Sequence, residues 1–215
     1  DGRSDILSIV SYQPTPKTNG AEVTLVAGTA AGGYGAPKVL FQLPAKDSGF
    51  IVSGDFNGDG KQDFALALSP SNPLDVPVGT INVYLGKGDG TFQSPKSFSF
   101  SGGLQHFSAR KVNRDNHLDL VLGLDSNNGS FSISVLLGKG DGTFEPAKTT
   151  SIAEDPIEMA LADVNLDDIP DVTVSDNQQF QELLGNGDGT FRVQTSFNHG
   201  SYGGYGNLVV TDFNG

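Results

Sequence analysis

The stretch that decides the fold is Asp55-Phe56-Asn57-Gly58-Asp59-Gly60-Lys61-Gln62-Asp63. Three carboxylates and one side-chain amide occupy odd positions of this stretch, at Asp55, Asn57, Asp59 and Asp63. Calcium binds six to eight oxygen atoms, so a short loop must bend sharply for its oxygens to converge. Gly60 is expected to supply the bend, because glycine adopts a positive φ angle without steric cost. The pattern therefore favours a calcium loop, with the Lys61 carbonyl at the remaining odd position, over an Asx-rich turn of mutually repelling carboxylates.

The same frame returns along the chain. Residues 163–171 repeat it in full as D-x-N-x-D-x-x-x-D, and residues 111–119 repeat it with Lys111 in place of the first aspartate. The chain begins with the back half of the frame and ends with its front half. Intervals of 58, 56 and 52 residues separate the last aspartate of each frame: Asp5, Asp63, Asp119 and Asp171. A period of this length is typical of propeller blades and other repeat arrays.

Composition narrows the class of protein. The formal net charge of −12 argues against nucleic acid and anionic membrane surfaces as partners, because both attract clustered Lys and Arg. Cysteine is absent, which excludes disulfides, thiolate catalysis and cysteine zinc sites. No apolar run is long enough to span a bilayer. These features remain compatible with secretion, because calcium and a large β core can stabilise an extracellular protein.

A second signature is Leu85-Gly-Lys-Gly-Asp-Gly-Thr-Phe92, which recurs at residues 137–144 and, with Asn for Lys, at residues 184–191. It lies between β-prone runs, so it predicts a hairpin turn of Asp-Gly type. A phosphate-binding loop is rejected, because such a loop opens a helix and avoids a central carboxylate. The phenylalanines that end the signature are expected to be buried between neighbouring sheets: Phe92, Phe144 and Phe191.

Each repeat is expected to contain four short strands, on either side of the acidic loop and of the glycine-rich turn. In the second repeat the strands include residues 51–56, 64–69 and 80–85. Residues 11–20 are expected to form a polar loop. Residues 153–162 contain helix-forming residues, but they occupy the repeat position of a strand and are predicted as one. A single four-stranded meander cannot bury both faces, so the repeats should stack radially.

The acidic loop followed by the glycine-rich turn resembles the FG-GAP-like and VCBS repeats of secreted bacterial proteins. Tyr34-Gly35-Ala36-Pro37 is similar to the Gly-Ala-Pro element of the first group. The resemblance spans the whole chain in about four repeats, approximately 1–55, 55–111, 111–163 and 163–215. It implies an all-β fold, a β-propeller of four-stranded blades related to the integrin α-subunit head. Residues 1–215 are then one propeller domain or part of a larger, often seven-bladed, propeller.

The resemblance also implies calcium as the metal. Its ligands would be Asp55, Asn57, Asp59, Lys61 (carbonyl) and Asp63, and likewise Asp163, Asn165, Asp167, Ile169 (carbonyl) and Asp171. Two departures affect other positions. The Lys111 ammonium is hypothesised to replace the metal by pairing with Asp115 or Asp119, the alternative being that it points to solvent. Asp168 stands where glycine is usual, which predicts that this loop is strained or bends differently.

The half frames at the two ends would join into one complete frame, through Asp212, Asn214, Asp1 and Asp5. Either the chain is a window cut from a longer array, or its ends meet and close a ring. The first explanation is preferred, because four repeats are few for a ring of this family.

No catalytic constellation is visible in the sequence, so the chain is not expected to be an enzyme. His106, His117 and His199 are scattered, and the repeated metal frame accounts for the carboxylate pairs. Tyr202 and Tyr205 lie in a glycine-rich connection, where they would stack on sugars or anchor a partner. The alternative is a variable loop with one tyrosine in the core.

The expected function is a calcium-stabilised binding, adhesion or assembly module of a bacterial protein, secreted or on the cell surface. Its partner would be a protein or a carbohydrate, and self-association is possible. Two alternatives stay open: the non-catalytic propeller portion of a polysaccharide-active enzyme, and a lectin with sugar sites between blades.

Overall fold

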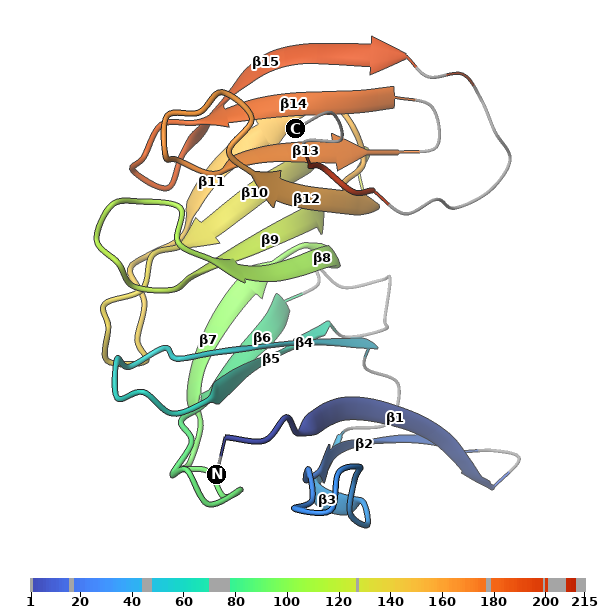
Figure 1. Cartoon of the computed structure of the whole chain (residues 1–215). Helices are drawn as coiled ribbons and strands as arrows, with labels where there is room; N and C mark the ends of the chain where they lie inside the picture. The colour runs from blue at the N-terminus through green and yellow to red at the C-terminus, as the bar shows by residue number, and fades with distance from the viewer. Residues whose placement is uncertain are drawn as a thin grey trace.

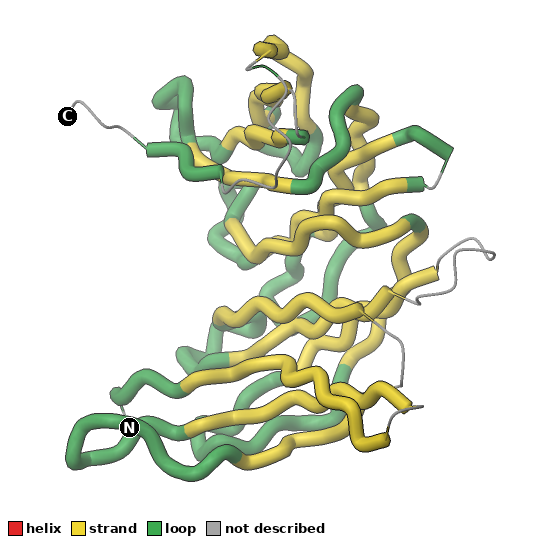
Figure 2. Tube along the Cα trace, turned by 90° about the vertical axis from the view of Figure 1, so that its right-hand side faces the viewer, coloured by secondary structure: helices red, strands yellow, loops and turns green. Residues whose placement is uncertain are grey.

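The computed structural model in Figure 1 describes residues 2–15, 18–43, 48–69, 78–126, 128–176, 179–198, 200 and 208–211. These residues form fifteen strands and no helix, as the strand and loop colours of Figure 2 show. The described part of the chain accordingly contains no helix that is long and apolar enough to cross a membrane.

The strands form four antiparallel sheets, and within each sheet they follow one another in sequence order. The first sheet contains β1 (Ile6–Thr15), β2 (Thr18–Val26) and β3 (Lys38–Leu43). The second contains β4 (Ser48–Gly54), β5 (Asp63–Ser69), β6 (Val78–Tyr84) and β7 (Lys96–Ser101). The third contains β8 (Gly103–Arg110), β9 (Asp119–Asp125), β10 (Phe131–Leu136) and β11 (Lys148–Ile152). The fourth contains β12 (Glu158–Ala162), β13 (Asp171–Ser175), β14 (Gln179–Gly185) and β15 (Phe191–Asn198).

The prediction of four strands per repeat is confirmed for the last three sheets. In each of them the acidic loop joins the first strand to the second, and the glycine-rich turn joins the third to the fourth. The strand β12 is formed where local propensity allowed a helix. Its pairing with β13, from Glu158↔Ser175 to Ala162↔Asp171, supplies tertiary contacts that override a weak local preference.

Two expectations for the first repeat are wrong. Its sheet has three strands among the described residues, in the order β1-β2-β3. The chain enters β1 directly after Asp5, and no described strand pairs with the edge of β1 that faces away from β2. Residues 11–20 do not form a polar loop. β1 and β2 continue as a hairpin to the pair Thr15↔Thr18, with a register shift after Tyr12↔Gly20. Backbone pairing across this hairpin extends both strands into the range for which the Pro and Gly residues predicted a loop.

The four sheets stack face to face in an open arc of propeller blades (Figure 1). One core cluster fills each interval between neighbouring sheets: around Val23 and Phe64, around Ile81 and Leu120, and around Ile133 and Val172. The first strands β4, β8 and β12 contact one another in turn, so they line the inner side of the arc. The chain is therefore an all-β propeller fold whose described blades do not close a ring.

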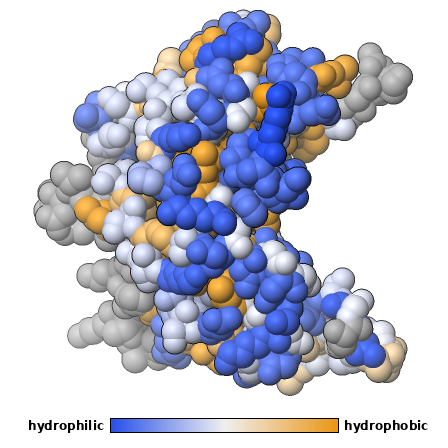
Figure 3. Space-filling view, turned by 90° about the vertical axis from the view of Figure 1, so that its left-hand side faces the viewer, coloured by the Kyte–Doolittle hydropathy of each residue, from blue (hydrophilic) through white to orange (hydrophobic). Residues whose placement is uncertain are grey.

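The acidic loops and the glycine-rich turns all lie at the same end of the strands, on the left of Figure 1. This follows from the meander, because each acidic loop precedes a second strand and each turn follows a third strand that runs antiparallel to it. Figure 3 looks onto this face and shows it to be mostly hydrophilic, with hydrophobic residues in narrow strips. The repeated motifs thus gather on one polar face of the arc.

Candidate metal-binding loops and the blade contacts they make

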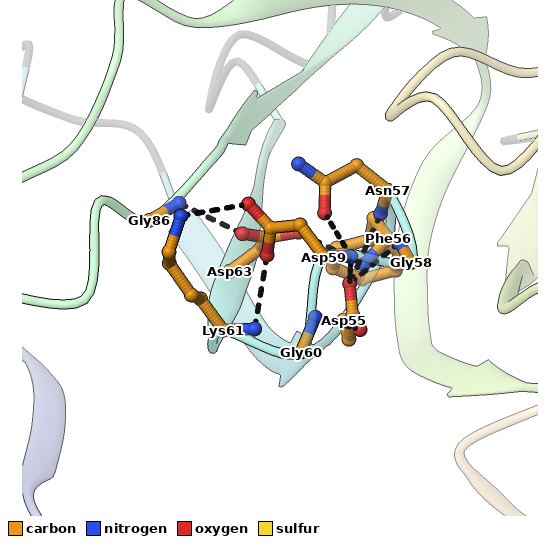
Figure 4. A network of polar contacts seen from close by, with 9 residues as sticks. All are labelled: Asp55, Phe56, Asn57, Gly58, Asp59, Gly60, Lys61, Asp63 and Gly86. Atoms are coloured by element: carbon orange, nitrogen blue, oxygen red, sulfur yellow. Dashed lines mark hydrogen bonds and ion pairs between the residues drawn. The ribbon is translucent and has the colours of Figure 1, made fainter. Parts of the chain in front are cut away.

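The loop between β4 and β5 is organised by the carboxylate of Asp55. Its Oδ1 accepts hydrogen bonds from the amides of Gly58 at 2.7 Å and Asp59 at 3.2 Å, and its Oδ2 accepts one from Gly60 at 2.8 Å (Figure 4). The φ angles of Gly58 and Gly60 are 74° and 78°, in the left-handed region that glycine occupies freely. The sharp bend predicted at Gly60 is thus present.

The middle of the same loop is fixed by Asn57 and Asp59. The Asn57 Oδ1 accepts the Asp59 amide at 3.1 Å, and the Asp59 Oδ1 accepts the Lys61 amide at 2.9 Å. The Lys61 ammonium pairs with the Asp59 Oδ2 at 3.2 Å, with both side chains exposed. The hydrogen bond from the Lys61 amide is the main cause that lowers the pKa of Asp59. Asp59 therefore carries a negative charge at neutral pH.

The last aspartate of the frame lies in a different environment. Asp63 is 1% exposed, and its two oxygens accept the amides of Phe56 at 2.9 Å and Gly86 at 2.7 Å. Through these two hydrogen bonds it links the acidic loop to the glycine-rich turn of the same sheet, a link that we call the clasp. The position recurs, and each carboxylate accepts an amide from its own loop and one from its own turn: Asp119 with Val112 and Gly138, and Asp171 with Val164 and Gly185. Asp5 accepts the Gly28 amide in the same way, at 2.8 Å.

Burial opposes the ionisation of Asp63 and Asp119, and the amide hydrogen bonds favour it. At Asp63 and at Asp119, desolvation is the larger effect and raises the pKa of the carboxyl group. The amides lower it, because hydrogen bonds to an ionised carboxylate stabilise its charge. The sequence pattern did not anticipate the clasp. A signal was available, however, since each of these aspartates directly precedes an apolar strand.

The loop of residues 163–171 repeats the arrangement without glycine. The carboxylate of Asp163 accepts the amides of Asp167 at 3.1 Å and Asp168 at 2.8 Å, and Asp167 accepts the amide of Ile169 at 2.9 Å. Leu166 and Asp168 have φ angles of 62° and 64°. The left-handed region is costly for residues with a Cβ, so the strain expected at Asp168 is present and extends to Leu166. Asn165 completes the loop by donating to Asp167 at 3.0 Å.

The loop of residues 111–119 does not use its lysine as a tethered cation. Lys111 is exposed and forms no ion pair with the residues that the structure describes. Asp115 accepts the Asn113 amide group at 2.8 Å and the His117 backbone amide at 2.9 Å, while Asp119 is occupied by its clasp. The hypothesis of a lysine substitute for the metal is therefore wrong, and the solvent-facing alternative holds.

The oxygen chemistry of loops 55–63 and 163–171 fits a hard cation such as calcium, since their side-chain donors are carboxylates and amides. An ionised carboxylate offers about four acceptor sites, so a backbone hydrogen bond does not exhaust it. In the described residues, however, no three or more acidic or histidine side chains converge well enough to hold a metal. The loops therefore present oxygen atoms of the right kind for a metal, but these oxygens accept hydrogen bonds from the backbone amides of their own loops.

The glycine-rich turn is a hairpin, as predicted. In the first copy the Lys87 amide donates to the Thr91 carbonyl at 2.9 Å, and Asp89 accepts the Thr91 amide at 2.9 Å. Its glycines Gly88 and Gly90 have φ angles of 82° and 76°. The hydrogen bonds to Thr91 lower the pKa of Asp89, so this exposed carboxylate serves to close the turn.

The turn also docks onto the preceding sheet, a role that the sequence did not reveal. The Gly142 amide donates to the Phe56 carbonyl in the acidic loop of that sheet, at 3.0 Å. A Cβ atom at Gly142 would lie 2.8 Å from the Leu85 side chain, too close for a real contact. The Lys96 ammonium donates to the Asp141 carbonyl at 2.6 Å. The equivalent contacts recur between the third and fourth sheets: Lys148 with Asp188, Leu137 with Gly189, and the bridge Asn113↔Asp188.

The phenylalanines of the turn lie between sheets, as predicted. Phe144 is buried and meets Phe56 and Phe98 of the preceding sheet edge to face, with ring centroids 6.1 and 5.3 Å apart. Phe191 is buried in the cluster between the third and fourth sheets. Phe92 is partly buried and packs edge to face against Phe64 at 4.7 Å.

The histidines do not form a catalytic arrangement among the described residues. His106 on β8 contacts the Ser108 hydroxyl through Nε2 at 3.0 Å, and burial lowers its pKa. The His117 ring lies against Gly140 of the turn in its own sheet. Predictions for His199, Tyr202, Tyr205 and the joined end frame (Asp1, Asp212, Asn214) concern positions outside the described residues.

A model of the FG-GAP-like repeat matches the chain twice, over residues 55–122 and 111–174. The chain belongs to the FG-GAP-like repeat family. The matched segments contain the three acidic loops and the blades between them, so the family assignment rests on the motifs described above. This confirms the resemblance seen in the sequence.

No curated protein matches this FG-GAP-like chain. Among solved structures, it is similar to one titled for specific recognition of non-reducing terminal N-acetylglucosamine by an Agrocybe aegerita lectin. The identity is 12%, over 92% of this chain and 80% of that one, with a TM-score of 0.29. Similarity this low supports no inference about function.

Proposed function

We propose that this FG-GAP-like chain is a calcium-stabilised binding module that works outside the cell, secreted or on the surface of a bacterium. The observation that carries the proposal is the pair of loops that keep the full acidic frame on one polar face of the blades. Each loop concentrates several carboxylates, and within the described part of the chain their only ion pair with a basic side chain is the exposed one between Lys61 and Asp59. A bound divalent cation would offset their repulsion.

The residues that would hold calcium are those of the two complete frames. In the first loop they are the side chains of Asp55, Asn57, Asp59 and Asp63 with the Lys61 carbonyl. In the second they are Asp163, Asn165, Asp167 and Asp171 with the Ile169 carbonyl. Calcium would supply positive charge and oxygen coordination there. The Phe56 carbonyl of the first loop accepts the Gly142 amide of the next blade, so a cation that rigidifies this loop would also support the contact between blades.

Calcium that binds the folded loop but not the unfolded chain stabilises the protein by mass action, by about 2.7 kcal/mol per site at a hundredfold excess over Kd. We therefore expect excess calcium to raise Tm and EDTA to lower it. Asp59→Ala should reduce the calcium-dependent part of Tm. Asp89→Ala, which removes an exposed carboxylate from a glycine-rich turn, is the matched control and should retain the calcium response. A Tm that is the same in calcium and in EDTA would refute the stabilising role.

The partner is proposed to be a protein or a carbohydrate, with adhesion or assembly as the outcome. The repeated loops and turns are occupied in holding blades together, which leaves recognition to segments outside the repeat. Sedimentation of the chain with calcium tests self-association, and binding to immobilised extracellular matrix proteins tests adhesion. Glycan-array binding that is lost in both Tyr202→Ala and Tyr205→Ala would instead indicate a lectin, and turnover of a polysaccharide would indicate an enzyme.

A further inference from the structure

Three asparagines in the described turns are followed directly by glycine: Asn57-Gly58, Asn128-Gly129 and Asn186-Gly187. An asparagine in this context reacts with its own backbone. The nitrogen of the next residue attacks Cγ of the side chain, a succinimide ring forms and ammonia leaves. Water then opens the ring to aspartate or to isoaspartate, in which the main chain runs through the former side chain. A following glycine favours the attack, because it has no side chain to hinder the nitrogen.

The first two pairs have the same geometry on the side-chain part of this reaction. The Asn57 Oδ1 accepts the amide of Asp59 at 3.1 Å. The Asn128 Oδ1 accepts the amide of Ser130 at 3.0 Å. The glycine that follows is exposed in both pairs, with a φ angle of 74° after Asn57 and 78° after Asn128. A difference between the two pairs must therefore come from the attacking nitrogen.

The attacking nitrogen is held at the first pair. The Gly58 amide donates to the Asp55 Oδ1 at 2.7 Å, the shortest of the amide bonds to that carboxylate (Figure 4). The attack requires that this amide loses its proton and turns toward the asparagine side chain. A hydrogen bond to a carboxylate opposes both changes, because it is charge-assisted and stronger than a bond between neutral groups.

The attacking nitrogen is free at the second pair. Gly129 lies in the hairpin between β9 and β10, which the Ser126 amide closes by donating to the Ser130 carbonyl at 3.0 Å. Within the described part of the chain, no group accepts a hydrogen bond from the Gly129 amide. A Cβ atom at Gly129 would meet nothing within 4 Å, so the succinimide ring and water have room here.

The third pair is restrained in a different way. The Asn186 Nδ2 donates to the Thr190 hydroxyl at 2.9 Å, which directs the side chain across the turn. A Cβ atom on the glycine that follows would lie 2.9 Å from Ile169 Cδ1, so this glycine is packed. In the other two acidic loops, Arg114 and Leu166 follow the asparagine of the frame, and their side chains hinder the attack.

We propose that Asn128 is a site of spontaneous deamidation in the folded protein, and that Asp55 protects Asn57 from the same reaction by holding the Gly58 amide. The reaction consumes water and releases ammonia, so it needs no enzyme and no cofactor. At Asn128 it adds a negative charge to the hairpin at the end of β9 that is remote from the acidic loop. The proposal does not depend on calcium binding by Asn57, since it rests on the hydrogen bond between Gly58 and Asp55.

The test incubates the full chain in mildly alkaline buffer, both folded and in denaturing urea. Conversion of each asparagine is followed by peptide mass spectrometry and by isoaspartate-specific methylation. In the folded chain we expect Asn128 to convert about ten- to hundredfold faster than Asn57, the factor that corresponds to the usual strength of a hydrogen bond to a charged group. In urea the two rates should become similar, because no structure then holds either nitrogen.

Two variants separate the role of Asp55 from that of the loop as a whole. Asp55→Ala removes the acceptor of the Gly58 amide and should bring the rate at Asn57 close to that at Asn128. Asp59→Ala is the matched control, because it removes a carboxylate from the same loop and leaves that acceptor in place, so Asn57 should stay slow. All proteins are kept in EDTA, so that a difference in calcium binding does not enter the comparison.

Equal rates at Asn57 and Asn128 in the folded chain would overturn the proposal, and so would an Asn128 that reacts far more slowly in the folded chain than in urea. A folded Asp55→Ala protein in which Asn57 stays slow would refute protection by Asp55. If Asp55→Ala does not fold, Asp55→Asn takes its place. Its acceptor oxygen is neutral, so Asn57 should still react faster than in the unaltered chain, and an unchanged rate contradicts the proposal.

Discussion

The last aspartate of each frame connects local chemistry with the architecture of a blade. Its two oxygens accept one amide from the acidic loop and one from the glycine-rich turn, and these two amides are about twenty to thirty residues apart in sequence. Asp119 is the cleanest example, because its loop lacks the first carboxylate of the frame and is not among the proposed calcium sites. It is fully buried, and its contacts to Val112 and Gly138 are both 2.8 Å.

Asp119→Ala should therefore destabilise the protein whether or not calcium is present. The substitution leaves the buried amides of Val112 and Gly138 without an acceptor, at about 1–3 kcal/mol for each group. We expect the free energy of unfolding from urea titration to fall by about 2–4 kcal/mol. Asp115→Ala removes an exposed carboxylate of the same loop and should cost well under half as much. Equal losses in the two variants would show that the clasp contributes little.

At the scale of the element, the glycine-rich turn performs two tasks. It reverses the chain between the third and fourth strands through glycines with positive φ. It also places a glycine without a side chain, Gly142 in the third sheet, against Leu85 of the preceding blade. The lysine four residues after the turn's phenylalanine, Lys96 or Lys148, then reaches the corresponding turn of the next blade. The regular phase of these lysines was a signal in the sequence for contacts between blades.

The two tasks can be separated with two glycines of the third sheet. Gly142 and Gly129 have φ angles of 77° and 78°, so alanine is strained equally at both. A Cβ at Gly142 would meet Leu85 at 2.8 Å, whereas one at Gly129 would meet nothing within 4 Å. We expect Gly129→Ala to lower the free energy of unfolding by about 1–2 kcal/mol, from backbone strain alone. Gly142→Ala should cost about 1–3 kcal/mol more because of overpacking. Equal costs would contradict docking of the turn.

At the scale of the whole molecule, the blades form a row in which the core clusters lie between nearest neighbours. Such a row approximates a one-dimensional array, whose stability is a sum over blades and the interfaces between them. A defect in one interface should then be felt mainly by the two blades that form it.

This locality predicts the outcome of amide exchange in two core variants. Leu183→Ala opens the cluster between the third and fourth sheets, at a cost of about 2–5 kcal/mol. Exchange should accelerate in β8–β15 and remain slow in β4 and β5. Ile81→Ala, in the cluster between the second and third sheets, should instead accelerate exchange in β4–β11. The same acceleration in every sheet for both variants would mean that the blades unfold as one unit.

The sequence by itself determined the strands, the turns and the family, because these depend on local chemistry repeated in phase. Alternation of apolar residues, Asp-Gly turns and the acidic frame act within a few residues of one another. The period of the frame, read from Asp63 to Asp119 and Asp171, then indicated a stack of similar sheets. It also identified the candidate calcium ligands, whose oxygen type is a property of the residues alone.

Only the tertiary structure decided what those motifs touch. The buried hydrogen bond from Gly86 to Asp63 and the fit of Gly142 against Leu85 join residues separated by about twenty to sixty positions. No local pattern encodes such pairs, because each depends on how one sheet is placed against the next. The outer limits of the hairpin at residues 11–20 also depended on backbone pairing across strands, which overrode the local Pro and Gly signals.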